Sequence, residues 1–180
     1  MTYFCLVLIA QTPARVKKPD SPSVVEWKAM LPRIESILEE SPCPRRPSYG
    51  VVDAFGTKGN ELSVALVDAC QGGAYTDEIV AFRLEHGQPV LAEFRDAKGK
   101  HVANSFLNGA SVMHSVDIRL VPEKKAIYDM SADSDRNGRP AAKCNVKAYV
   151  WNAGSRTFDL DSQLSKSAGQ EYCRRMRAGK

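Results

Sequence analysis

The chain has 180 residues, of which 43% are hydrophobic and 26% are charged, and its formal net charge at pH 7 is +4. This length and composition are typical of one globular domain that buries enough apolar surface to fold without a metal. The small positive charge is spread along the chain, which argues against the concentrated basic surface of a nucleic-acid-binding protein.

The chain begins with an apolar run and a proline-rich stretch. Residues 3–10 read YFCLVLIA, a run too short for a membrane-spanning helix of about 20 residues but of the length and position of a signal-peptide core. We expect residues 1–10 to be a signal peptide that lacks its basic start, residues 11–22 a flexible linker, and residues 23–180 a single β-rich domain. The protein would then be secreted or periplasmic. The alternative is a buried N-terminal strand.

A helix is predicted for Ser23–Glu40, because its apolar residues recur at helical spacing and share one face. Pro32 interrupts this segment, so the helix either kinks there or begins anew. The apolar positions are Trp27, Met30, Leu31, Ile34, Ile37 and Leu38.

Short alternating segments follow and predict strands. They are Glu61–Val67, Glu78–Leu84, Pro89–Phe94, His101–Leu107, Val112–Leu120, Ala126–Met130, Lys143–Trp151 and Thr157–Leu160. Residues 162–180 return to a helical composition. We therefore predict an α+β fold: an antiparallel, twisted sheet of about seven to eight strands, packed by an N-terminal and a C-terminal helix.

Three aromatic residues near these strands are candidate ligand contacts. Tyr149 and Trp151 share one face of their strand, and Tyr128 lies on the strand before it. Together they would form a stacking surface for a sugar or a nucleic acid. The alternative is that they belong to the core.

The turn Asp133-x-Asp135-x-Asn137-Gly138 follows the pattern in which alternate side chains converge on a calcium ion. Over these six residues it resembles the calcium loops of EF-hands and of FG-GAP-type β-repeats. The resemblance implies Asp133, Asp135 and Asn137 as ligands. It departs at the twelfth position, where an EF-hand has Glu and this chain has Cys144. A local turn stabilised by Asp and Asn is the alternative.

Four cysteines remain outside the apolar leader, an even number that predicts two disulfides in an exported chain. Similar spacings favour the pairs Cys43–Cys70 and Cys144–Cys173. The other connectivities, and four buried thiols in a cytoplasmic protein, stay open.

No catalytic set is evident. Ser111 and His114 are a conceivable nucleophile and base, although their segment lacks the second glycine of a nucleophile elbow. Asp68, Asp77 and Glu78 are carboxylates near strand ends. The function expected from the sequence is therefore an exported, non-enzymatic domain that binds a protein or a glycan, with no cofactor, no nucleic acid and no stable membrane span. An exported hydrolase that uses Ser111 and His114 or strand-end carboxylates is the alternative, and a structural calcium module is the third.

Overall fold

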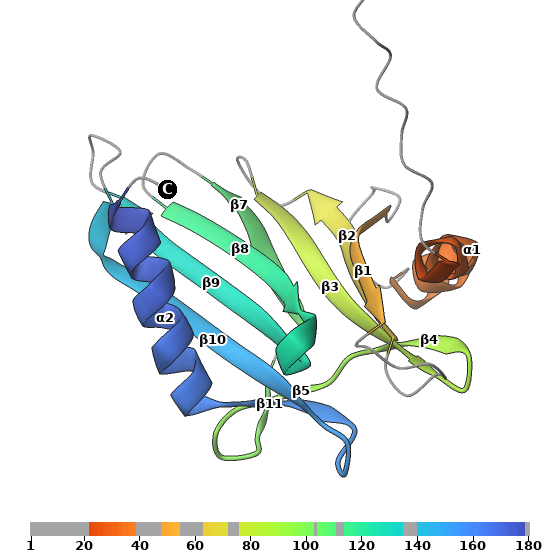
Figure 1. Cartoon of the computed structure of the whole chain (residues 1–180). Helices are drawn as coiled ribbons and strands as arrows, with labels where there is room; N and C mark the ends of the chain where they lie inside the picture. The colour runs from red at the N-terminus through yellow and green to blue at the C-terminus, as the bar shows by residue number, and fades with distance from the viewer. Residues whose placement is uncertain are drawn as a thin grey trace, which may run out of the picture.

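The computed structural model describes residues 22–38, 48–54, 63–71, 76–102, 104–110, 114–134 and 140–178. They form two α-helices and one curled sheet of eleven strands, which confirms a mixed α+β fold (Figure 1). The helices are α1 (Pro22–Leu38) and α2 (Ser162–Arg177), and η1 (Pro122–Lys124) is a short 3-10 helix. The strands are β1 (Ser48–Ala54), β2 (Ser63–Gln71), β3 (Thr76–Glu85), β4 (Gln88–Leu91), β5 (Phe94–Arg95), β6 (His101–Val102), β7 (Ser105–Ala110), β8 (His114–Val121), β9 (Ala126–Ser134), β10 (Pro140–Asn152) and β11 (Thr157–Leu160).

The strand order is β1-β2-β3-β7-β8-β9-β10-β11-β5-β6, and β4 pairs with β3. All described pairs are antiparallel except β11 with β5. The sequence predicts fewer strands, because it does not assign β1 and because the segments Pro89–Phe94 and His101–Leu107 each contain parts of two short strands. The Asp96 carboxylate separates β5 from β6 by accepting the N–H groups of Lys98 and Lys100, at 2.8 and 2.9 Å. A hairpin turn at His86 and Gly87 joins β3 to β4, and Gly87 has the positive φ of +74° that favours glycine.

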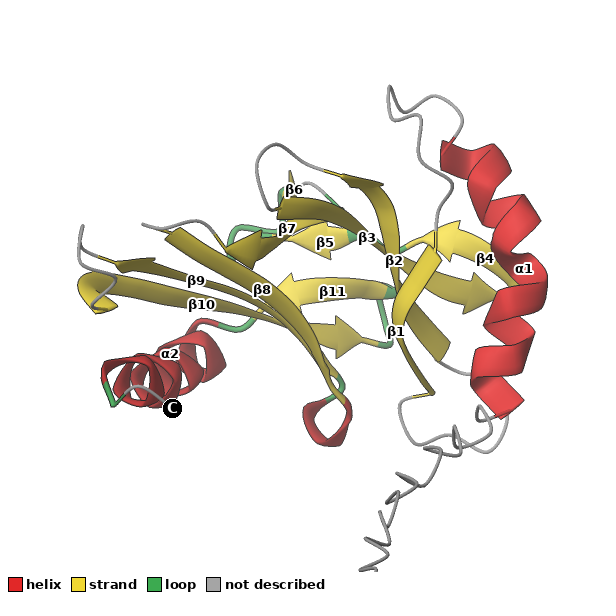
Figure 2. Ribbon diagram, turned by 90° about the horizontal axis from the view of Figure 1, so that it is seen from above, coloured by secondary structure: helices red, strands yellow, loops and turns green. Residues whose placement is uncertain are grey.

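The sheet curls so that strands from its two ends face each other across its concave, inner face (Figure 2). Phe94 of β5 is fully buried at the centre of the inner core. Its ring lies 4.9 Å from that of Phe106, 5.2 Å from that of Tyr149 and 5.3 Å from that of Phe158. These contacts join β5 to β10 and β11 and, across the inner core, to β7. The curled sheet, and not a covering helix, therefore buries the inner face.

A second core lies on the outer face of β2 and β3, beneath α1. Trp27 and Ile34 are fully buried there against Val67 and Phe82. The Trp27 indole N–H donates to Ser63 Oγ at 2.9 Å. The predicted helix and its apolar face are thus confirmed, and α1 continues through Pro32 without ending.

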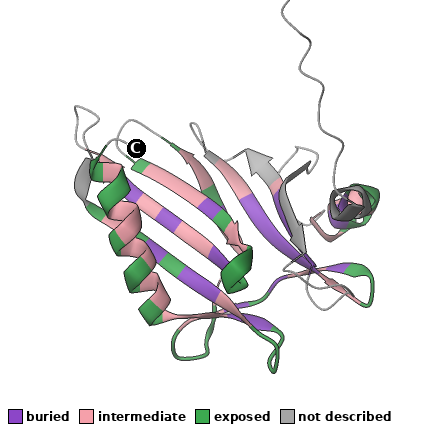
Figure 3. Cartoon of the chain, viewed as in Figure 1, coloured by how far each residue is buried: buried purple, intermediate pink, exposed green. Residues whose placement is uncertain are grey.

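The helix α2 packs on the outer face of β10 and β9, well away from α1 (Figures 1 and 2). None of its residues is fully buried, as the half-buried and exposed colours along it show (Figure 3). Neither described helix is long and apolar enough to cross a membrane. The helix α2 is therefore attached to the sheet while part of its apolar surface stays uncovered.

Candidate functional site: a groove beside α2

Hydrogen bonds at its N-terminus hold α2 against β10. Asp161 caps the helix, since its carboxylate accepts the N–H of Leu164 at 2.8 Å. The N–H of Ala148 donates to Ser165 Oγ at 2.8 Å, and this hydroxyl donates to the Asp161 carbonyl oxygen at 2.6 Å. One turn later, a Cβ on Gly169 would lie 3.8 Å from the Val146 nitrogen. This is an ordinary contact distance, so helix and strand already lie close together at this turn.

A cysteine pair joins the other end of α2 to β10. Cys144 and Cys173 lie at disulfide distance, with a Cα–Cα separation of 5.8 Å. This is one of the two pairs that the sequence spacing favours. Both cysteines line a cleft of about 430 Å³ on the β10 side of α2, together with Lys166 and Arg177.

On its opposite side α2 forms one wall of a larger groove of about 1000 Å³, called here the α2 groove. The wall is an apolar stripe at i, i+4 spacing, which places its members on one helix face. The stripe consists of Leu164, Ala168, Tyr172 and Met176, all half-buried.

The floor of the α2 groove is the outer face of β8 and β9. Tyr128 pairs with Arg119 across these strands, and Met130 and Val121 lie on the same face. Partial burial raises the pKa of the Tyr128 hydroxyl, and the carboxylates of Glu123 and Asp161 raise it further. The phenol therefore stays neutral at physiological pH and offers the floor an aromatic body with a polar tip.

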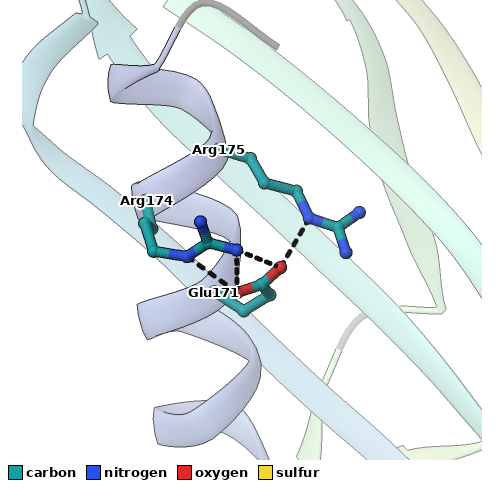
Figure 4. Close-up of polar contacts among 3 residues, drawn as sticks. All are labelled: Glu171, Arg174 and Arg175. Atoms are coloured by element: carbon teal, nitrogen blue, oxygen red, sulfur yellow. Dashed lines mark hydrogen bonds and ion pairs between the residues drawn. The ribbon is translucent and has the colours of Figure 1, made fainter.

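Charged side chains also line the α2 groove. The groove is lined by the cations Arg119, Lys124, Arg174 and Arg175 and by the carboxylates Glu123 and Glu171. Glu171 accepts hydrogen bonds from Arg174 and Arg175, at 2.8 and 2.7 Å (Figure 4). These hydrogen bonds hold the pKa of Glu171 below its usual value. The single carboxylate of Glu171 thus pairs with two guanidinium groups, so the cluster of Glu171, Arg174 and Arg175 has a net charge of +1.

The structure does not bring the three candidate aromatic residues onto one face. Tyr128 pairs with Ala148, whereas Tyr149 pairs with Ile127. Adjacent residues of a strand point to opposite faces, so Tyr128 lies in the α2 groove while Tyr149 lies in the inner core. Trp151 packs against that same core, with its ring 5.2 Å from that of Phe158. The three residues therefore do not form the shared stacking surface that the sequence predicts.

The histidine of the hydrolase hypothesis lies at the far end of β8. His114 Nδ1 is 2.7 Å from Asp133 Oδ1, and both side chains are well exposed. Ser111 lies outside the described residues. Asp77 and Glu78 are adjacent on β3 and point to opposite faces, so they do not form a carboxylate pair. Asp68, on β2, pairs with Ile79.

Other predicted site residues fall in parts of the chain that the structure does not describe. These are Asp135 and Asn137 of the calcium turn, Cys43, and the side chain of Cys70. Asp133 is described, and its carboxylate contacts His114. Among the described residues, no group of three or more His, Cys, Asp or Glu side chains could hold a metal ion.

Sequence reasoning missed the wall of the groove. The spacing of Leu164, Ala168, Tyr172 and Met176 was available as a signal, because it is the i, i+4 pattern of an amphipathic helix. The floor had no comparable signal, since the outer positions of β8 and β9 look like ordinary strand residues.

Comparison of the chain with protein-family models, with curated proteins and with solved structures finds no match.

Proposed function

We propose that this protein is an exported, non-enzymatic binding domain that holds a segment of a partner protein in the α2 groove. The observation that carries the proposal is the combination of a partly uncovered apolar groove of about 1000 Å³ with a cationic lining. Binding sites in proteins combine an apolar surface with a few placed polar groups. The cysteine pair at disulfide distance supports export, because disulfides persist in oxidising compartments.

The lining favours a protein over a glycan. Leu164, Met130 and Met176 contribute aliphatic and thioether surface, and methionine adapts to apolar side chains of different shape. Tyr128 and Tyr172 are the aromatic residues of the groove. A peptide with apolar and acidic side chains satisfies both the apolar wall and the cations.

Selection from a displayed library of random peptides on the full-length protein tests the proposal. We expect enriched peptides to be rich in Asp and Glu, and to bind Tyr172→Asp at least tenfold more weakly than the wild type. Leu107→Asp is the matched control, since Leu107 is 51% exposed on β7 and does not line the α2 groove. Peptides that bind both variants equally well contradict the proposal. Oligosaccharides that bind with the same dependence on Tyr172 assign the groove to a glycan instead.

A hydrolase is the second candidate function, because the His114–Asp133 contact resembles the carboxylate that orients a catalytic histidine. Hydrolysis of p-nitrophenyl acetate by the wild type, lost in His114→Ala and kept in His101→Ala, would support it. Equal rates in the wild type and in both variants would remove it.

A further inference from the structure

The α2 groove has room for a second helix beside α2. Neighbouring strands lie about 4.8 Å apart, and a helix with its side chains is about 10 Å across, so one helix covers roughly two strands. The helix α2 covers β10 and β9, and β8 is the next strand in the sheet. Figures 1 and 2 show no described α-helix over the outer face of β8, and the short η1 lies at the end of this strand.

The wall of the groove has the spacing that another helix can match. Leu164, Ala168, Tyr172 and Met176 follow one another at successive turns along the length of α2. With 16 residues, α2 is about 24 Å long. Helices pack by interlocking rows of side chains three and four residues apart. A partner helix with apolar residues at the same spacing would bury this stripe.

The floor of the groove favours a helix over an extended segment. The strand β9 pairs with β8 on one side and with β10 on the other, so its backbone groups are already paired. An extended peptide on this face would meet side chains and leave its own N–H and C=O groups without sheet partners. A helix satisfies these groups internally.

The charges specify an acidic partner. Four cations and two carboxylates line the groove, and the Asp117 carboxylate pairs with Arg119 at 2.6 Å, which leaves a net charge of +1. A second copy of α2 is a poor occupant, because its last turn carries Arg174, Arg175 and Arg177. The N-terminal residues of this chain are equally poor, since the first carboxylate in the sequence is Asp20.

We propose that the occupant of the α2 groove is an amphipathic, acidic α-helix of a partner protein that lies alongside α2 over β8. Its apolar residues at i, i+4 spacing contact Tyr172 and Met130, and its carboxylates face Arg119 and Arg175. This inference rests on the proposed function and specifies the partner of the same groove.

Two displayed libraries of equal length test the inference on the full-length protein. One randomises positions on a helix-forming background of Ala, Glu, Gln and Lys, and the other places proline at every fourth position to prevent helix formation. We call a peptide a groove-dependent binder when Tyr172→Asp weakens its binding. We expect such binders from the helical library only, and we expect these peptides to carry a net negative charge. Two prolines introduced into the middle of a binder should weaken it at least tenfold. Binding should weaken at least tenfold in Tyr172→Asp and at least fivefold in Arg175→Glu, and should not change in Leu107→Asp.

The outcomes separate the two proposals. Groove-dependent binders from the proline library, or prolines without effect, overturn the helix and leave the binding function standing. A lack of groove-dependent binders from both libraries overturns both. Self-association of the wild type that Tyr172→Asp abolishes assigns the groove to a second copy of this chain. Arg175→Glu changes an exposed side chain, so it keeps the test valid if Tyr172→Asp fails to fold.

Discussion

Removal of the Cys144–Cys173 link should lower the free energy of unfolding by about 3.5 kcal/mol. The two cysteines are 29 residues apart, and the cross-link lowers the entropy of the unfolded chain by an amount that depends on this loop length. The cross-link matters to α2 in particular, because no residue of this helix is fully buried against the sheet. With a urea m-value of about 2 kcal/mol/M, the loss corresponds to a midpoint lower by roughly 1.8 M.

Urea unfolding of the double variant Cys144→Ser/Cys173→Ser, followed by circular dichroism, measures this loss. Wild-type protein with a reducing agent should unfold at or below the midpoint of the double variant. Addition of the reducing agent to the double variant is the control, because a further decrease would come from other cysteines. A double variant as stable as the oxidised wild type would refute the reasoning that the link stabilises the docked helix.

Three further predictions concern α2 and the inner core. Gly169→Ala should raise the free energy of unfolding by about 0.5 to 1 kcal/mol in urea, because the added Cβ meets Val146 at ordinary contact distance and alanine favours a helix. Asp161→Ala should lower it by about 1 kcal/mol in the same assay, since the cap of α2 is lost. Burial, and then nearby carboxylates, raise the pKa of Tyr149 to about 12. The folded protein therefore holds this proton while the unfolded chain releases it near pH 10. The free energy of unfolding should fall between pH 10 and 12, and it should fall less in Tyr149→Phe. An equal fall in both proteins would contradict the raised pKa of Tyr149.

Local patterns in the sequence identify the helices and most strands. Trp27 and Ile34 share a helical face and are buried together beneath α1. Thr157–Leu160 is a strand with the predicted bounds. Such patterns succeed because one buried face imposes a period of 3.6 or 2 on the apolar residues.

Pairing between strands decided the rest of the fold. Nothing in the residues near Phe94 indicates that β5 will lie parallel to β11 and close the inner core, since that contact joins segments about 60 residues apart. The choice of face for Tyr128 depends on its pairing with Ala148 in the next strand. A shift of one residue in this register would have placed Tyr128 in the core and Ile127 in the groove.

The candidate site likewise has one part that local sequence patterns determine and one part that depends on tertiary structure. The sequence by itself determined the apolar stripe on α2 and the presence of arginines in its last turn, because both depend only on spacing within one helix. Only the tertiary structure decided that this stripe and these arginines face an uncovered part of the sheet, beside Arg119 and Tyr128 of its strands. A groove is a relation between elements that are distant in sequence, and no local pattern encodes the distance between them.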